Sequence, residues 1–270
     1  MLYLNGAALG CGKFPNRETY VDTRRIPLMD GSVIRMQFED NDDLMNLMLL
    51  KGHLDDNGVK DITLEVPYMP YSTMDHTDGG KPLSLKYVAR LINSMKFDHV
   101  VTYEPHSMVT EALVDRLEVR SCLRELVYMA MERFADYSTA IFCFPDLGAE
   151  KRYQGLGFVT GKTLTFQKVR EFNTGKILSM ACRDEIRPLD GTELFIILDD
   201  LCRGGRTFIE CANILRAKGA KQIALCVTHL EQAAFNGVLK KDSPVDFVVA
   251  TNSCLPQKNV DAEKLVILEI

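Results

Sequence analysis

The stretch from Leu194 to His229 constrains the fold of this chain more than any other part of the sequence. It opens with an unbroken apolar run at 194–198, which indicates a strand buried on both faces. Asp199 and Asp200 follow at once. Strands of this kind occur in parallel sheets that are covered by helices, so the stretch predicts an α/β fold.

A helix and a second strand complete this βαβ unit. Residues 208–218 carry apolar side chains at helical spacing, and residues 223–227 indicate the next buried strand. Thr207 is the expected N-cap of the helix, and Gly219 is the expected C-cap. A polar loop therefore lies at the carboxyl end of the first strand, which is where open α/β sheets bind ligands.

This loop has the composition of a site for a phosphorylated sugar. Gly204 and Gly205 let the backbone approach an anion closely, and the start of a helix offers unpaired N–H groups. Asp199 and Asp200 are poor phosphate ligands, but they can accept hydrogen bonds from two sugar hydroxyls or bind Mg²⁺ through water. The alternative is an ordinary βα turn with solvated acids.

The stretch resembles the phosphoribosyl pyrophosphate (PRPP) motif of the type I phosphoribosyltransferase fold. It is most similar to the version in ribose-phosphate diphosphokinases, the PRPP synthetases, and further motifs in the same order extend the resemblance over nearly the whole chain. The resemblance implies an α/β protein of two tandem type I phosphoribosyltransferase-like domains, each a mainly parallel sheet flanked by helices.

The domain boundary is expected between a helix and a strand. Residues 121–137 show helical periodicity, and an apolar strand follows at 140–144. We therefore predict an N-terminal domain at 1–137 and a C-terminal domain, which carries the PRPP-type loop, at 138–270.

Composition and charge argue against other classes of protein. The net charge of −5 gives no sign of a nucleic-acid partner, and no apolar run approaches the roughly 20 residues that span a membrane. The first residues lack the basic and apolar regions of a signal peptide. Eight scattered cysteines without a CxxC pair favour reduced thiols, so we expect a cytoplasmic protein.

Two segments resemble the ATP-binding segments of the family. In the first, Phe-Pro-Asn-x-Glu, the resemblance implies that Asn16 and Glu18 reach the nucleotide across a subunit interface, and hence at least a dimer; an edge turn is the alternative. In the second, the family's Arg-Gln pair is replaced by Thr73 and Met74, whereas Asp75 is retained. The replacement removes a fixed cation beside ATP.

The resemblance also assigns a Mg²⁺ cofactor and two catalytic cations. His106 matches a family histidine that binds a catalytic Mg²⁺, and Asp146 matches a second Mg²⁺ contact. Lys168 and Arg170 resemble a catalytic flexible loop whose cations stabilise charge on the transferring diphosphoryl group. Without the resemblance, a lone histidine is more often structural, and a Lys-x-Arg pair is usually solvated.

The phosphate loop departs from the family pattern. Arg203 replaces an acid and Arg206 replaces a glycine, while Gly204, Gly205 and Thr207 complete the loop that we expect to bind the ribose and its phosphate. Two guanidiniums can bind a larger anion such as a diphosphate bidentately. The acceptor is therefore ribose 5-phosphate, or it is ADP-ribose, as in divergent virus-encoded relatives that rebuild NAD through ADP-ribose pyrophosphate.

These resemblances imply a diphosphokinase that transfers pyrophosphate from ATP to the anomeric hydroxyl of a 5-phosphorylated ribose and releases AMP. Two alternatives stay open. A non-catalytic regulatory paralogue of PRPP synthetase would fit the lost Arg-Gln pair and the changed loop. A phosphoribosyltransferase would consume PRPP, but two domains of this fold and the Lys-x-Arg loop argue against it.

Overall fold

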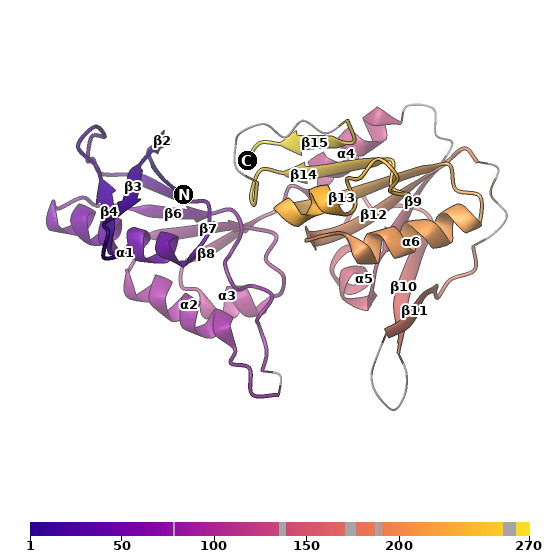
Figure 1. Ribbon diagram of the computed structural model, residues 1–270, viewed down its shortest axis with the longest axis horizontal. Coiled ribbons are helices and arrows are strands. Elements are labelled where there is room, and N and C mark those ends of the chain that lie inside the picture. The colour runs from indigo at the N-terminus through magenta and orange to yellow at the C-terminus, as the bar shows by residue number, and fades with distance from the viewer. Residues whose placement is uncertain (78, 135–138, 171–176, 187–188, 190, 256–262) are drawn as a thin grey trace. The chain divides into compact units, whose positions relative to one another are not determined.

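The computed structural model describes residues 1–77, 79–134, 139–170, 177–186, 189, 191–255 and 263–270 (Figure 1). The chain divides into two compact units, Met1–Ser121 and Cys122–Ile270. Each unit has its own sheet and its own hydrophobic core.

The first unit is built on a sheet with the strand order β2-β1-β5-β6-β7-β8. Its strands are β1 (Leu2–Leu4), β2 (Ala7–Ala8), β5 (Val33–Met36), β6 (Thr63–Val66), β7 (His99–Tyr103) and β8 (Leu117–Arg120). Strands β5 to β8 are parallel, and β1 pairs antiparallel with β2 and β5. The remaining elements are a hairpin of β3 (Gly10–Lys13) and β4 (Thr19–Asp22), and the helices α1 (Asn41–Asp56), α2 (Ser84–Ser94) and α3 (Val109–Leu113).

The second unit is built on a sheet with the strand order β11-β10-β9-β12-β13-β14-β15. Its strands are β9 (Thr139–Phe144), β10 (Thr163–Arg170), β11 (Ile177–Cys182), β12 (Glu193–Cys202), β13 (Gln222–Leu230), β14 (Phe247–Thr251) and β15 (Leu265–Leu268). The pairing is parallel except for the antiparallel hairpin β10–β11. The helices are α4 (Leu123–Arg133), α5 (Leu147–Tyr153), α6 (Arg206–Ala217) and the short 3₁₀ helix η1 (Gln232–Asn236).

Helices cover both faces of the second sheet, as Figure 1 shows for α4 and α6. Alternate residues of a strand point to opposite faces, and β13 follows this rule. Leu225 and Val227 belong to the core cluster that includes Phe208 of α6, whereas the Cys226 thiol lies against the Leu126 carbonyl of α4. The apolar run of β12 is therefore buried from both sides, as its composition predicts.

The predicted fold class is confirmed, because two mainly parallel sheets are each flanked by helices. The division between the units lies elsewhere than the expected position at 137. Helix α4 packs against β13 and β14 of the second sheet, so the division falls before this helix, after Ser121. Helical periodicity in the sequence shows that a helix exists, but it does not show which sheet the helix covers.

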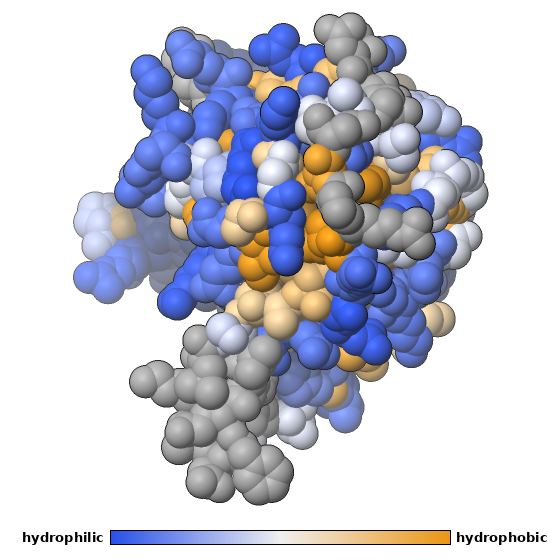
Figure 2. All heavy atoms as spheres, turned by 90° about the vertical axis from the view of Figure 1, so that its right-hand side faces the viewer, coloured by the Kyte–Doolittle hydropathy of each residue, from blue (hydrophilic) through white to orange (hydrophobic). Residues whose placement is uncertain are grey.

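Some apolar residues that pack against the core of the second unit are only partly buried. Figure 2 shows apolar side chains gathered among polar ones on the face turned toward the viewer. The partly buried apolar residues packed against this core are Met180, Cys182, Ile186, Leu189, Ile209, Ile214, Phe235 and Ile267. Among the described residues, no helix combines the length and the apolar character that crossing a bilayer requires.

Candidate active site

Two adjacent carboxylates lie near the carboxyl end of β12. The strand continues to Cys202, beyond the predicted end of the apolar run, so Asp199 and Asp200 are strand residues. The Asp199 side chain is 14% exposed and that of Asp200 only 4% exposed. Such burial of two like charges calls for a nearby cation.

That cation is Arg152, at the end of α5. One guanidinium nitrogen, Nη2, lies 3.1 Å from Oδ1 of Asp199 and 2.8 Å from Oδ1 of Asp200. The Asp200 backbone N–H also donates to Asp199 Oδ1 at 2.9 Å. Burial and the charge of Asp200 raise the pKa of the Asp199 carboxyl well above its ordinary value, while Arg152 acts in the opposite direction.

The sequence prediction did not include Arg152. Its only sequence signal is an arginine late in a short polar segment that follows strand β9, a parallel neighbour of β12. Helix α5 spans 7 residues, which is too short to give a reliable helical periodicity.

The loop after β12 is held by backbone contacts to the segment after η1. The Val238 N–H donates to the Gly204 carbonyl at 3.1 Å. Gly205 has φ +81°, and a Cβ at this position would lie 2.5 Å from the Val238 Cβ. A glycine is therefore required at position 205 both by its left-handed backbone and by the close approach of Val238.

Helix α6 begins at Arg206, before the residue that the sequence predicts as its N-cap. The prediction of Thr207 as N-cap is wrong, because the helix begins at Arg206 with Gly205 as the N-cap and has no side-chain cap. A glycine N-cap has no side-chain oxygen to accept the first N–H groups. These donors suit an anion such as a phosphate.

The two arginines of the loop are exposed and paired with glutamates. The Arg203 side chain is 59% exposed, and its Nε lies 3.4 Å from a Glu231 carboxylate oxygen. The Arg206 side chain is 92% exposed, and its Nε donates to Glu210 at 3.0 Å, one turn along α6. Exposed pairs of this kind are weak and exchange easily for a charged ligand.

Asp146 caps helix α5. Its Oδ1 accepts a hydrogen bond from the Ala149 N–H at 3.0 Å. The residue is thus fixed at the carboxyl end of β9, one strand away from the carboxylate pair. The same helix carries Asp146 at its start and Arg152 near its end.

The predicted catalytic cations belong to hairpin β10–β11. Lys168 is half-buried and lies opposite Met180 in the antiparallel ladder. Arg170 ends β10, opposite Ile177, after a shift of register between Val169 and Arg170. The side chain of Arg170 lies outside the described part of the chain.

In the first unit, Asp75 and His106 are electrostatic neighbours. Burial raises the pKa of Asp75. Hydrogen bonds to Ser107 and His76 and the charge of His106 together lower this pKa by more, so the net shift is downward. Asp75 Oδ1 lies 2.8 Å from Nδ1 of His76. An ionised carboxylate beside an imidazole can accept hydrogen bonds from the ring N–H groups.

Thr73 and Met74 lie in the turn before Asp75. The Met74 N–H donates to the Tyr71 carbonyl at 2.8 Å, and the Met74 side chain is 47% exposed. Neither side chain carries the positive charge of the arginine that the resemblance would place here.

Asn16 and Glu18 lie in the turn between β3 and β4. The Asn16 Oδ1 accepts a hydrogen bond from the Glu18 N–H at 3.2 Å, and both residues are exposed. The turn presents both side chains on the surface of the first unit.

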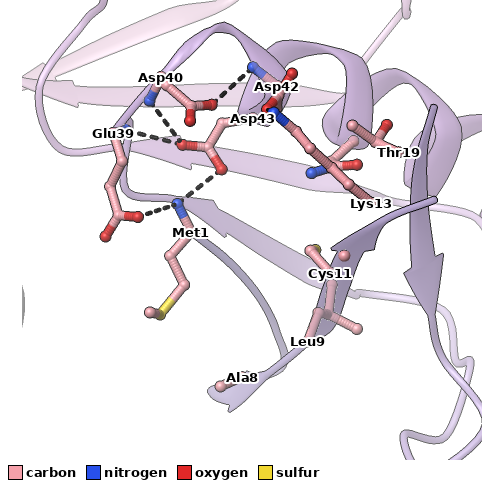
Figure 3. Close-up of a pocket in the computed structure, with 12 residues that line it drawn as sticks. Met1, Ala8, Leu9, Cys11, Lys13, Thr19, Glu39, Asp40, Asp42 and Asp43 are labelled. Atoms are coloured by element: carbon pink, nitrogen blue, oxygen red, sulfur yellow. Dashed lines mark hydrogen bonds and ion pairs between the residues drawn. The ribbon is translucent and has the colours of Figure 1, made fainter. Parts of the chain in front are cut away.

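A cavity of about 370 Å³ in the first unit lies elsewhere (Figure 3). It is lined by parts of β2, β3 and the start of α1, and an ion pair joins Lys13 to Asp42 at its wall. None of the predicted site residues lines it.

The described residues thus bring together two groups of predicted residues. In the second unit, Asp199, Asp200 and the loop 203–207 adjoin one another on a single βα connection. In the first unit, Asp75 lies near His106. Within the described ranges there is no group of three or more His, Cys, Asp or Glu side chains that could hold a metal ion.

This chain is similar to several known proteins. A family model described as the N-terminal domain of ribose phosphate pyrophosphokinase matches residues 2–95. Ribose-phosphate pyrophosphokinases of Ureaplasma parvum, Bradyrhizobium diazoefficiens and Aquifex aeolicus are 27%, 26% and 28% identical to this chain over 80%, 90% and 85% of its length. The matches span 66%, 77% and 73% of those proteins.

A solved structure shares the fold. The crystal structure of phosphoribosylpyrophosphate synthetase from Mycobacterium smegmatis superposes with a TM-score of 0.75 and 24% identity. The superposition covers 97% of this chain and 86% of that chain, so it includes both units.

Proposed function

We propose that this chain, a divergent member of the ribose-phosphate pyrophosphokinase family, is a Mg²⁺-dependent diphosphokinase. It transfers the diphosphoryl group of ATP to the anomeric hydroxyl of a 5-phosphorylated ribose. One observation carries the proposal: the largely buried carboxylates of Asp199 and Asp200 lie near the end of β12, and the short loop that follows leads into a helix start without a side-chain cap. The carboxylates suit two ribose hydroxyls, and the helix start suits a phosphate.

The chemical step is an attack of the anomeric oxygen on the β-phosphorus of ATP. The bond from the β-phosphorus to the oxygen that bridges it to the α-phosphorus breaks, AMP leaves, and the proton of the anomeric hydroxyl is released to water. Asp199 and Asp200 orient the acceptor through its 2- and 3-hydroxyls. Lys168 and Arg170 stabilise the negative charge of the group in transit, since such transfer depends mainly on positioning and electrostatics.

We propose His106 as a Mg²⁺ ligand in the first unit and, separately, Asp146 as a Mg²⁺ ligand in the second unit. The carboxylate of Asp146 fits an ion that takes one or two carboxylates and completes its shell with phosphate oxygens and water. When bound, the ion neutralises charge on the phosphates of ATP. The hydrogen bond from the Ala149 N–H to Asp146 Oδ1 holds this carboxylate at the end of β9, which supports the assignment.

We favour ADP-ribose as the acceptor. Its diphosphate carries one more phosphoryl group than ribose 5-phosphate, and the exposed guanidiniums of Arg203 and Arg206 adjoin the phosphate loop. The names of the relatives point instead to ribose 5-phosphate, so both acceptors belong in the test.

The test is AMP release from ATP and Mg²⁺ with each acceptor in parallel. We expect AMP with ADP-ribose, and we expect the double variant Arg203→Gln and Arg206→Gln to lose activity with ADP-ribose more than with ribose 5-phosphate. AMP with ribose 5-phosphate alone would reject the larger acceptor. If no AMP is released with either acceptor, the diphosphokinase proposal is rejected and a regulatory paralogue is favoured. If the chain then consumes PRPP together with a nucleobase, a phosphoribosyltransferase is favoured.

We also propose that the protein assembles at least as a dimer. Helix α1 buries one face in the first unit but exposes Met45, Met48 and Leu49 by 49%, 40% and 41%. Their spacing forms one apolar stripe along the helix, and exposed stripes of this kind are typical of protein interfaces. Light scattering after size exclusion tests this: a dimer that Met48→Glu converts to a monomer is expected, and a monomeric wild type contradicts it.

A further inference from the structure

A single side chain joins the two carboxylates of the candidate acceptor site. Nη2 of Arg152 lies within 3.1 Å of Asp199 and 2.8 Å of Asp200, and it contacts Oδ1 of each. The guanidinium is itself sheltered, with its side chain 26% exposed and its Cζ 5.2 Å from the ring centroid of Tyr153. Arg152 is therefore held from one side by an aromatic ring and from the other by both acids.

The contact fixes the direction in which the acids point. Oδ1 of Asp199 already accepts the backbone N–H of Asp200, so one oxygen of Asp199 is held by two donors. Each carboxylate has a second oxygen, and an ionised carboxylate can accept several hydrogen bonds. Two neighbouring hydroxyl groups of a sugar can each donate to one carboxylate of such an oriented pair.

Helix α5 makes this support rigid. The helix is capped at its start by Asp146 and packs against β9, β10 and β12 of the sheet. Two further contacts hold it in place: Glu150 accepts a hydrogen bond from the Thr165 hydroxyl at 2.9 Å, and Arg183 lies 3.6 Å from Glu150. A guanidinium on such a helix has little freedom to leave the acids.

We propose that Arg152 is a positioning residue, which holds Asp199 and Asp200 as a preformed receptor for two adjacent hydroxyl groups of the acceptor sugar. The inference rests on the proposed function for the identity of that sugar. Its structural part, the dependence of the acid pair on Arg152, does not require any ligand.

Acceptor binding without ATP tests the role in recognition. Calorimetric titration of Arg152→Gln with ADP-ribose and with ribose 5-phosphate should show an affinity about 10- to 100-fold below wild type, because a charged hydrogen-bonded partner is lost. Arg152→Lys should recover part of the loss, since it restores charge but not the planar fork. Lys151→Gln, the matched control at an exposed basic residue of the same helix, should bind as wild type does.

A charge cycle in the ligand-free protein tests the support directly. Arg152→Gln should lower the melting temperature, because two buried carboxylates lose their cation. Adding Asp200→Asn to Arg152→Gln should raise the melting temperature again, since one of the two repelling charges is removed.

The outcomes separate the inference from the proposed function. Unchanged acceptor affinity in Arg152→Gln overturns the positioning role, and so do additive losses of melting temperature in the double variant. If wild type binds neither acceptor and releases no AMP, the proposed function fails, and the inference fails with it as a statement about acceptor sugars. Recovery of melting temperature in the double variant would then show only that Arg152 balances the charge of the acid pair.

Discussion

Lys168 gives the sharpest test of a single proposed catalytic side chain. It is half-buried on β10, and its ammonium is suited to the charge that develops on the diphosphoryl group. Lys168→Ala should lower the rate of AMP release by about 10²- to 10³-fold while acceptor affinity changes little. Lys162→Ala is the control. Lys162 lies just before the start of the same strand, and its ammonium donates to the Glu185 carbonyl instead. Near-normal turnover in Lys168→Ala would remove this residue from the mechanism.

The cysteines should differ in reactivity according to burial. Burial raises the pKa of the Cys143 and Cys226 thiols, and it raises the pKa of Cys202 and Cys254 to about 12. A raised pKa keeps a thiol protonated at pH 8, and the protonated form is unreactive. Cys11 is exposed, although burial of part of its side chain raises its pKa as well.

Iodoacetamide labelling at pH 8 followed by peptide mass spectrometry checks this order. Cys11 should be modified in the folded protein, whereas Cys143 and Cys226 should react only after urea is added. Equal labelling rates for Cys11 and Cys143 in the folded protein would contradict the described packing.

Single residues show where sequence reasoning is strong and where it stops. The acid pair is predictable, because a five-residue apolar run favours a buried strand and the charged residues that follow it are expected near the end of that strand. Arg152 is not predictable in the same way, because it reaches Asp199 across 47 positions of sequence. Such a contact depends on which strands are neighbours, and one sequence alone does not give the strand order.

The connection from β12 to α6 predicts a contrast between two adjacent glycines. A Cβ on Gly205 would meet the Val238 Cβ at 2.5 Å, and the residue has φ +81°, whereas a Cβ on Gly204 meets nothing within 4 Å. Gly205→Ala should therefore lower the free energy of unfolding by about 1–3 kcal/mol, while Gly204→Ala should change it by less than about 0.5 kcal/mol. Urea unfolding monitored by circular dichroism measures both, and equal stability of the two variants would contradict the loop geometry.

The sequence predicts that a helix exists more reliably than it predicts the residues at which the helix begins and ends. The periodicity at 208–218 corresponds to α6, which runs from Arg206 to Ala217 with Gly219 just beyond, at φ +101°. The start differs because Gly205 adopts a left-handed conformation against Val238, and that contact is not visible in local sequence. The short helix α5 has no counterpart among the elements predicted from the sequence. It carries Arg152, and Asp146 is its N-cap.

The division of the whole chain depends on which sheet α4 covers. Leu123, Leu126, Val127 and Ala130 of this helix are fully buried, and the Cys226 thiol of β13 lies 3.7 Å from the Leu126 carbonyl. The predicted boundary at 137 would assign α4 to the first domain, whereas its contacts are with β13 and β14. Chain order does not fix such a choice, because a connecting helix is adjacent in sequence to both units.

Two fragments that differ only by the segment containing α4 test this division. Residues 122–270 should give a soluble protein with one cooperative urea transition, since the fragment keeps both helical layers of the sheet. Residues 138–270 lack three large buried side chains of α4, each worth about 1.5–3 kcal/mol. That loss is comparable to the roughly 5–15 kcal/mol that stabilises a typical domain, so this fragment should aggregate or unfold without a cooperative transition. If the fragment 138–270 unfolds cooperatively at the same urea concentration as the fragment 122–270, α4 does not stabilise the second unit and the division at Ser121 is contradicted.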